Sequence, residues 1–421
     1  MSVNGMSDYH IPADVPDDLA DTYLENLMAA TCGTGSMNLF ACDQKIEHLN
    51  EDFYDGGKSI PLSSNDPGHL FEIGAIAHRE GTVGVLAAQG GLISLYGRDH
   101  PDVPYLVKLN SKSHLVKTKQ RDPVSLAMWD MDDVMSLVSN GLNVVGIGYT
   151  VYIGSEYEHE MMTEAAHFIR QAHEEGMIAV VWMYPRGKAV EDEKDPQLIA
   201  GAAGVAACIG ADFAKVNYPR AWDGMTQPES LKVAVEAAGR CGIICSGGGS
   251  LPANDFLQRL WDQINISGCK GAATGRNIHQ KSTDEAVRMT AACHAIISQG
   301  ASVDEPMDIF QGNRVNPCCS RLKQRCFAQC EQAFIGKSSC FFDMKNVGGI
   351  ERSVRALFGA SLVLLDFFAT IQLEFIFLIV GLWGVLTSTF GYCPFNWLMG
   401  RNTCAIRYDN TPVEEIVTEP F

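Results

Sequence analysis

Short apolar runs alternate with amphipathic, helix-like segments between Asn38 and Gly275. Eight of these runs resemble strands, and the segments between several of them repeat their apolar positions at helical spacing. We predict strands at residues 38–43, 82–88, 105–109, 143–149, 177–183, 211–217, 242–246 and 270–274. The clearest predicted helices cover residues 156–175, 196–209, 227–239, 253–264 and 283–299. Strands that alternate with helices pair in parallel through right-handed crossovers.

The number of these units predicts an α/β fold of the (β/α)₈ type, the TIM barrel. Eight strands over this length suit a closed barrel better than an open, doubly wound sheet. An open dinucleotide-binding sheet would have G-x-G-x-x-G after its first strand, whereas Cys42-Asp-Gln-Lys45 stands there. In a barrel the carboxyl ends of all strands meet at one rim, where the chemistry is found.

One of the predicted strands contains a lysine. The run Ala211–Pro219 places Lys215 in the middle of an apolar stretch that opens into a Tyr-Pro-Arg turn. Burial lowers the pKa of an amine, and a neutral amine can attack a ketone to form a Schiff base. Alternatively, Lys215 could extend its amine out of the strand end, or it could pair with a carboxylate such as Asp212.

The other predicted strand ends carry polar side chains, aromatic side chains or glycines. In chain order these are Asp43, Lys108, Tyr149, Trp182, Tyr184, Ser246, Gly247, Gly248, Gly249, Gly275 and Arg276. Tyr184 could act as general acid and base, and Asp43 could orient hydroxyls or assist loss of water from a carbinolamine. Trp182 shares a strand face with Tyr184 and would help to wall the site. Instead, Tyr184 could cap a strand end and Asp43 the following helix.

The glycine runs after the seventh and eighth strands predict a phosphate site. Ser246–Gly249 and Gly275 offer backbone N–H groups, and Arg276 offers a guanidinium. The alternative is that the glycines only form tight turns. Lys108 is a second cation of this rim, which could bind substrate oxygens, lower the pKa of Lys215, or pair with Asp43 or another carboxylate. Glu47 and His48 follow Asp43 without an assignable role.

Composition narrows the choice of partners. The 421 residues suffice for one large domain and a smaller one, and 46% are hydrophobic. The formal net charge of -18 argues against a nucleic-acid surface, which needs clustered Lys and Arg.

Because His48 is the lone histidine near the rim, we expect no metal and no other cofactor. The first thirty residues resemble neither a secretory signal nor a transit peptide. Isolated cysteines in apolar segments indicate a reducing compartment.

Five motifs follow one another in this part of the chain. They are Asp43-Gln-Lys-Ile-Glu-His48, Trp182-x-Tyr184-Pro-Arg-Gly187, Ala-Asp-Phe-Ala-Lys215-Val, Ser246-Gly-Gly248 and Gly275-Arg-Asn277. Together they resemble the archaeal-type class I fructose-bisphosphate aldolases, over residues 20–300. The resemblance implies a Schiff base at Lys215, proton transfer by Tyr184 and supporting roles for Asp43 and Trp182.

The same resemblance extends to ligands and assembly. It implies a phosphate site around Ser246–Gly248 and Gly275–Arg276, homo-oligomers, no metal, and phosphorylated ketoses and trioses as substrates. Related branches use the same lysine on other sugar phosphates, as aldolases, transaldolases or thiolases. Members of the family carry a carboxylate shortly after the lysine, for which Asp223 and Glu229 are candidates here.

The chain becomes almost continuously apolar at residues 353–392. The two stretches, 353–371 and 375–392, each approach the ~20 residues that span a bilayer. Basic residues precede the first and follow the second, so we predict a membrane hairpin with both ends, and the barrel, in the cytoplasm. Asp366 should then face the partner helix or another subunit. The alternative is a buried helical pair in a soluble domain.

Motifs flank these stretches at residues 344–352, 391–395 and 398–404. They resemble a small family of two-helix inner-membrane domains, over residues 344–405. We therefore predict an acidic extension at 1–30, a barrel at 31–300, a linker at 301–343, the hairpin domain at 344–405 and a polar tail at 406–421. The linker holds five cysteines that could bind zinc, be acylated or remain free: Cys318, Cys319, Cys326, Cys330 and Cys340.

Overall fold

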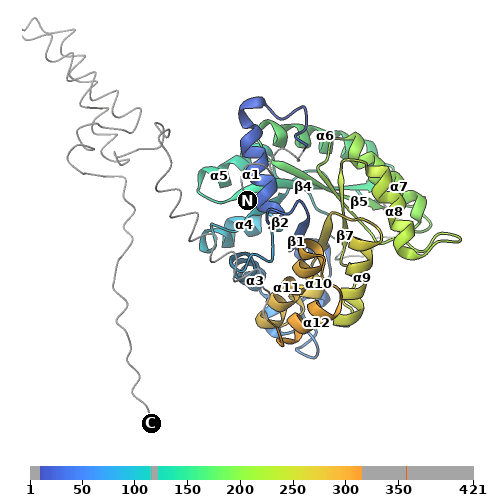
Figure 1. Cartoon of the computed structure of the whole chain (residues 1–421). Coiled ribbons are helices and arrows are strands. Elements are labelled where there is room, and N and C mark those ends of the chain that lie inside the picture. Colours follow the sequence, from blue (N-terminus) through green and yellow to red (C-terminus); the bar gives the residue numbers. More distant parts are fainter. Residues whose placement is uncertain (1–9, 114, 116–121, 315–356, 358–421) are drawn as a thin grey trace, which may run out of the picture. The chain divides into compact units, whose positions relative to one another are not determined.

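Eight parallel strands close into a barrel in the order β1 to β8, with β1 also paired to β8 (Figure 1). They are β1 (Met37–Ala41), β2 (Val85–Gln89), β3 (Tyr105–Lys108), β4 (Val144–Ile153), β5 (Ile178–Pro185), β6 (Phe213–Val216), β7 (Gly242–Ser246) and β8 (Gly271–Thr274). All eight predicted strands are present, and the predicted TIM barrel is confirmed.

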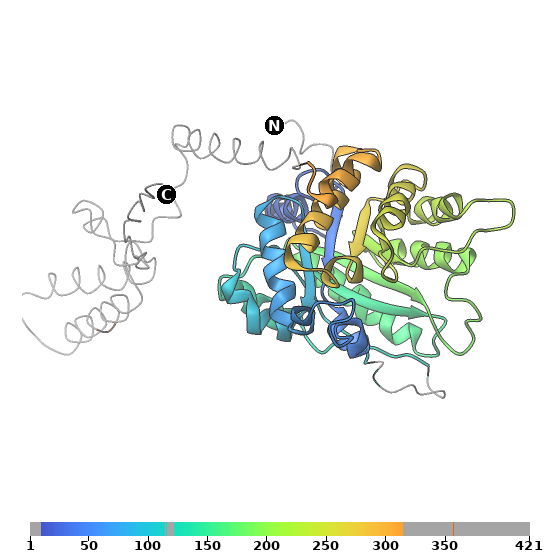
Figure 2. The ribbon, with the colours of Figure 1, turned by 90° about the horizontal axis from the view of Figure 1, so that it is seen from below.

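The helices surround the strands in two views of the molecule (Figures 1 and 2). They are α1 (Ala20–Ala30), α2 (Gln44–Glu47), α3 (Pro67–Arg79), α4 (Gly90–Tyr96), α5 (Met131–Ser139), α6 (Glu158–Glu174), α7 (Pro196–Cys208), α8 (Gln227–Ala238), α9 (Ala253–Asn265), α10 (Arg276–His279), α11 (Thr283–Gln299) and α12 (Asp304–Gln311). Short 3₁₀ helices are η2 (Asp17–Leu19), η3 (Asn50–Asp52), η4 (Leu62–Asn65) and η5 (Gly97–Asp99).

The computed structural model describes residues 10–113, 115, 122–314 and 357. The chain divides into two units, Met1–Cys326 and Phe327–Phe421, and all described residues except Leu357 belong to the first. Apart from Leu357, the predicted hairpin lies outside the described residues, as do the five linker cysteines and the polar tail. Among the helices that are described, none combines the length and the apolar character that a membrane span requires.

Alternate strand residues fill the inside of the barrel. Leu39, Val85, Ile178 and Trp182 belong to a buried cluster that also includes Leu27 of α1. α1 contacts β1, β4 and β5 and therefore adds to the barrel core, although it lies in the segment predicted as an extension. The first part of the predicted linker likewise contains α12, which packs on α9 and α11.

β4 is longer than the sequence pattern indicated. It continues to Ile153, and its register places Tyr152 beside Tyr184 of β5. Tyr149 is therefore in the middle of the strand and not at its end. Its hydroxyl meets the Ser125 carbonyl at 3.2 Å and the Glu164 carboxylate of α6, so its placement at the rim was wrong.

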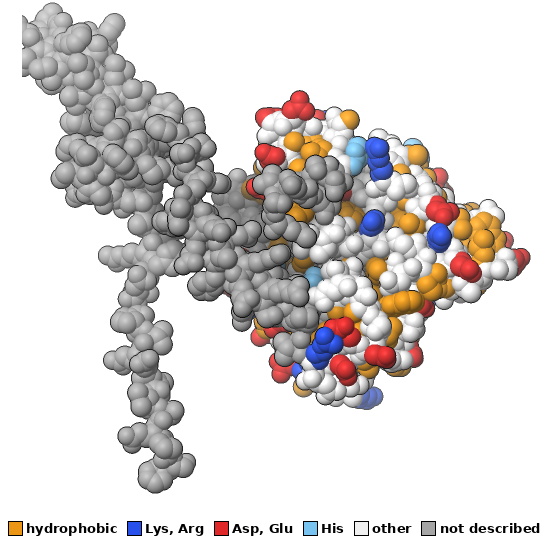
Figure 3. Space-filling model, in the orientation of Figure 1, with side chains coloured by type: hydrophobic (Ala, Val, Ile, Leu, Met, Phe, Trp, Pro, Cys, Tyr) orange, Lys and Arg blue, Asp and Glu red, His pale blue; other side chains and the backbone are white. Residues whose placement is uncertain are grey.

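The surface shown in Figure 3 carries both charge signs. On the part of this face that the structure describes, Lys and Arg side chains stand apart from one another among Asp and Glu. This distribution accompanies the formal net charge of -18 of the whole chain.

Candidate active site

A cavity of about 160 Å³ lies at the carboxyl ends of β1 and β5 to β8. It brings together most of the residues that the sequence placed at the rim. Its lining residues are Asp43, Gln44, Glu47, His48, Tyr184, Arg186, Lys215, Asn217, Ser246, Gly247, Gly248, Ala273, Gly275 and Arg276.

Lys215 projects into this cavity from β6 and is only 5% exposed. Its Nζ lies 5.0 Å from the ring centroid of Trp182, the neighbouring residue on β5. Burial lowers the pKa of the amine; the carboxylates of Asp43 and Glu47 oppose this effect. The site thus favours a neutral amine more than water does.

Lys215 neither extends its amine into solvent nor pairs with Asp212. The amine is buried, so it does not extend into solvent. Asp212 lies before β6 and binds elsewhere, accepting hydrogen bonds from the Tyr23 hydroxyl at 2.5 Å and from the Ala179 backbone N–H at 2.7 Å.

Tyr184 and Asp43 line the same cavity. Burial raises the pKa of the Tyr184 phenol well above its usual value, and the charges of Glu47 and Asp43 raise it further. The Asp43 side chain is buried but makes no capping bond to α2, the role considered as its alternative. Its Oδ1 has no hydrogen-bond partner among the described residues, so this oxygen is available to a polar ligand.

Lys108 is fully buried beside the cavity. Its Nζ donates to the Thr150 hydroxyl at 2.6 Å and to the Asn110 carbonyl at 2.9 Å, and lies 3.7 Å from Oε1 of Glu47. Lys108 thus pairs with a carboxylate of the rim, and its partner is Glu47 and not Asp43. The Lys108 charge also adds a smaller lowering of the Lys215 pKa.

The two glycine runs meet at one side of the cavity. Asn277 Nδ2 donates to the carbonyls of Gly247 and Gly249, each at 3.1 Å, and so joins the loops after β7 and β8. A Cβ on Gly275 would come within 2.0 Å of the Gln44 amide nitrogen, and Gly248 has a φ of +67°. Glycine at 275 thus leaves room for the Gln44 side chain, and glycine at 248 allows the left-handed backbone of that loop.

Several predicted residues lie elsewhere, and several lining residues were missed. Glu229 caps α8 in a capping box with Thr226, and neither it nor the exposed Asp223 lines the cavity. Arg186 and Asn217 do line it, each two residues beyond a predicted site residue. Because side chains two apart share a strand face, that spacing was a usable signal.

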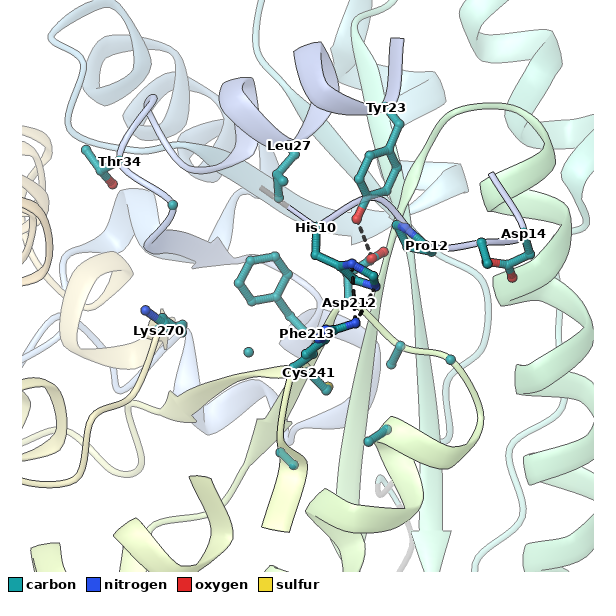
Figure 4. Close-up of a pocket in the computed structure, with 18 residues that line it drawn as sticks. His10, Pro12, Asp14, Tyr23, Leu27, Thr34, Asp212, Phe213, Cys241 and Lys270 are labelled. Atoms are coloured by element: carbon teal, nitrogen blue, oxygen red, sulfur yellow. Dashed lines mark hydrogen bonds between the residues drawn. The ribbon is translucent and has the colours of Figure 1, made fainter. Parts of the chain in front are cut away.

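A second cavity, of about 570 Å³, lies between the N-terminal residues 10–35 and the segments that lead into β6, β7 and β8 (Figure 4). Tyr23 and Asp212 meet there, joined by their hydrogen bond. None of the candidate catalytic residues lines it. This cavity is larger, but the predicted catalytic residues Asp43, Tyr184 and Lys215 line the rim cavity.

A metal centre is not apparent in the described part of the chain. Residues 10–113 and 122–314 contain no group of three or more His, Cys, Asp or Glu side chains placed to hold an ion.

A parallel (β/α)₈ barrel with a buried amine in a polar cavity at its carboxyl end defines a TIM-barrel enzyme scaffold.

Two family models match the chain. The model described as DeoC/LacD family aldolase matches residues 37–281, and the model described as inner membrane protein YgaP-like, transmembrane domain, matches residues 344–407. The chain belongs to the DeoC/LacD family of aldolases, and both predicted resemblances are confirmed.

Individual relatives agree with this assignment. The fructose-bisphosphate aldolase/6-deoxy-5-ketofructose 1-phosphate synthase of Methanocaldococcus jannaschii is 52% identical, over 73% of this chain and 96% of the relative. The fructose-bisphosphate aldolase structure from Slackia heliotrinireducens is 54% identical, with a TM-score of 0.70 over 73% and 96% of the two chains. An archaeal fructose-1,6-bisphosphate aldolase, solved with its catalytic Lys bound to a carbinolamine intermediate, is 29% identical, with a TM-score of 0.55 over 65% and 98%.

Proposed function

We propose that this protein is a Schiff-base aldolase that cleaves fructose 1,6-bisphosphate reversibly into dihydroxyacetone phosphate and glyceraldehyde 3-phosphate. The observation that carries the proposal is the buried Lys215 amine, which shares one cavity with Tyr184, Asp43 and two glycine-lined loops. Relatives named fructose-bisphosphate aldolase, at 52% and 54% identity, support the choice of substrate.

The proposed reaction begins with attack of the neutral Lys215 amine on the C2 ketone. Tyr184 gives its phenol proton to the departing hydroxyl of the carbinolamine, with Asp43 assisting, so that water leaves and an iminium and a Tyr184 phenolate remain. The iminium withdraws the electron pair of the C3–C4 bond as the C4 hydroxyl loses its proton to Tyr184. The aldehyde departs, and Tyr184 returns the proton to C3 of the enamine. Water then adds to the iminium and gives a proton back to Tyr184, and collapse of the carbinolamine releases dihydroxyacetone phosphate and the free Lys215 amine. Trp182 supports the pocket from behind its lining by packing beside Lys215, while Ser246, Gly247, Gly248, Gly275 and Arg276 hold a phosphate, and no metal takes part.

Reductive trapping tests the covalent step. Borohydride added with dihydroxyacetone phosphate should leave an adduct on the peptide that contains Lys215, and Lys215→Met should lose both adduct and activity. A wild-type peptide without added mass, or an active Lys215→Met variant, would contradict the proposal. Activity that survives EDTA would separate this mechanism from that of a metal-dependent aldolase.

A second candidate substrate is another phosphorylated sugar. It is favoured by the relative from Methanocaldococcus jannaschii, whose name includes 6-deoxy-5-ketofructose 1-phosphate synthase. Aldolase, transaldolase and thiolase assays on a panel of sugar phosphates would rank the substrates by kcat/KM. A non-catalytic sugar-phosphate sensor would bind the same panel without forming the Lys215 adduct.

We also propose that residues 344–405 form a membrane hairpin, with the catalytic barrel in the cytoplasm. The apolar stretches within 353–392 and the match to a transmembrane domain family over residues 344–407 support this. The proposed domain plan has an extension at 1–30 whose helix α1 packs on the barrel, the barrel at 31–300, a linker at 301–343 whose helix α12 packs on α9 and α11, and the tail at 406–421. The barrels assemble as homo-oligomers, which light scattering of the solubilised protein would test.

A further inference from the structure

The loop after β1 carries two polar side chains with no role in the proposed reaction. His48 lines the rim cavity, and Asp52 lies four residues later in η3. Nδ1 of His48 contacts Oδ2 of Asp52, and their side chains are 28% and 23% exposed. Because Nδ1 is engaged, Nε2 is the ring nitrogen left for a ligand, and in the imidazolium form both ring nitrogens donate, so Nε2–H can bind an anion.

Asp52 also holds the guanidinium of Arg276. NH1 of Arg276 lies 3.4 Å from Oδ2 of Asp52, the same oxygen that His48 contacts. Nε of Arg276 donates to the Gly248 carbonyl at 3.2 Å. Neither contact uses NH2, so two protein oxygens orient the guanidinium while one of its nitrogens remains for a ligand.

The position of Asp52 is itself fixed by the connection that follows β8. Gln280 Nε2 donates to the Asp52 carbonyl at 2.8 Å, and Phe53 stacks on His279 with ring centroids 4.7 Å apart. Burial lowers the pKa of His279 to about 3, so this ring packs in its neutral form.

The charge of Asp52 follows from its partners. The hydrogen bond from His48 lowers the pKa of this carboxyl, burial opposes that effect, and the charge of Arg276 lowers the pKa further. His48 and His279 contribute smaller favourable charge interactions. The carboxylate is therefore ionised at neutral pH and can hold both donors.

We propose that His48 is a ligand for the substrate phosphate beside Arg276, and that Asp52 is the positioning residue that aims both side chains at it. The two donors meet one carboxylate oxygen, so they lie next to each other at the cavity wall, near the backbone of Gly247 and Gly248. The inference rests on the proposed function, in which this phosphate belongs to the ketose. Asp52 thus determines the preference for phosphorylated over plain ketoses.

Calorimetric titration with inorganic phosphate tests the site without requiring any aldolase activity. Asp52→Asn is nearly isosteric and should weaken phosphate binding roughly tenfold or more. His48→Asn should weaken it by a smaller factor. The matched control is Glu51→Gln, which removes the exposed neighbouring charge and should leave binding unchanged. Unchanged affinity in Asp52→Asn would overturn the inference.

Borohydride trapping supplies a readout that simple structural damage would not reproduce. In Asp52→Asn, the concentration of dihydroxyacetone phosphate that gives half-maximal adduct should rise roughly tenfold. The half-maximal concentration of dihydroxyacetone, which carries no phosphate, should not change. Asp52→Glu should bring the half-maximal concentration of dihydroxyacetone phosphate part of the way back to that of the wild type. An equal loss with both ketones would refute a role in phosphate binding. An absence of adduct in the wild type would refute the proposed function, while the calorimetry would still decide the phosphate site.

Discussion

At the scale of single residues, two lysines share one aromatic neighbour but differ in their counter-ions. The Nζ atoms of Lys108 and Lys215 both lie 5.0 Å from the ring centroid of Trp182. Lys108 has the Glu47 carboxylate within 4 Å, whereas no ion pair is found for Lys215 among the described residues. Burial therefore dominates at Lys215 and lowers its pKa.

Removing the Tyr184 hydroxyl should separate adduct formation from turnover. We expect Tyr184→Phe to keep the borohydride-trapped adduct at Lys215 but to reduce kcat by roughly 10²- to 10⁴-fold, the usual contribution of a general acid–base group. Steady-state kinetics and peptide mass spectrometry on the same preparation would measure both. Full turnover in this variant would assign the proton transfer to another group.

Breaking the Glu47–Lys108 pair should cost stability. Lys108→Met leaves a carboxylate that is 10% exposed without its cation, and we expect a loss of about 3–5 kcal/mol in the free energy of unfolding. The double variant Lys108→Met with Glu47→Gln removes both charges and should recover a large part of that loss. Urea denaturation of the two variants checks this, and equal losses would show that the charge pair is not the cause.

At the scale of elements, the strand ends carry the site while the contacts between loops hold it in place. Asn277, in α10, bridges the loops after β7 and β8, and Gln280 bonds back to the loop after β1. The other end of the barrel has its own polar network. There His173 of α6 contacts Asp14 at 2.9 Å and Asp212 at 3.1 Å.

This network should make stability depend on pH. Burial lowers the pKa of His173, but its hydrogen bonds and charge interactions with Asp212 and Asp14 outweigh burial and raise it to about 9. The imidazolium therefore stabilises the fold fully below its unfolded pKa of about 6.5, and that contribution is lost as pH rises through about 9. We expect a loss on the order of 2 kcal/mol, measured by urea denaturation across this range.

His173→Gln supplies the control for that pH dependence. The variant should be less stable at pH 6 and should show a flatter profile between pH 6.5 and 9. Burial lowers the pKa of His279 to about 3 and that of His294 to about 4, so these residues change stability only at more acidic pH. A wild-type profile that stays flat to pH 9 would contradict the assignment.

At the scale of the whole molecule, the proposed membrane segment should be separable from catalysis. A chain that ends at Arg314 keeps every residue lining the rim cavity. We expect it to leave the membrane fraction while retaining kcat/KM within roughly twofold, since the barrel supplies its own core. Carbonate washing of membranes should leave the full chain in the pellet. Release of the full chain by carbonate would contradict the hairpin.

Most of the barrel was predictable because its signals are local. Strand runs and intervening helices follow from apolar periodicity, and residues at strand ends meet at one rim in any barrel of this type. Lys215, Tyr184 and Asp43 were placed at the rim in this way, and all three line the rim cavity. Tyr149 was misplaced because the run Val144–Ile153 stays buried and β-rich beyond the point where the pattern suggested an end.

Partners across the barrel could not be predicted in this way. The pairing of Lys108 with Glu47, and the shared contact of Asp52 with His48 and Arg276, join residues from different loops. Their geometry depends on how strands stagger and how loops pack, and no residue spacing encodes either. Chain order and periodicity thus specify the barrel, its rim and the place of Lys215 at that rim. The counter-ions and the direction of each donor arise only when folding brings distant segments together, because electrostatic effects depend on distances in space.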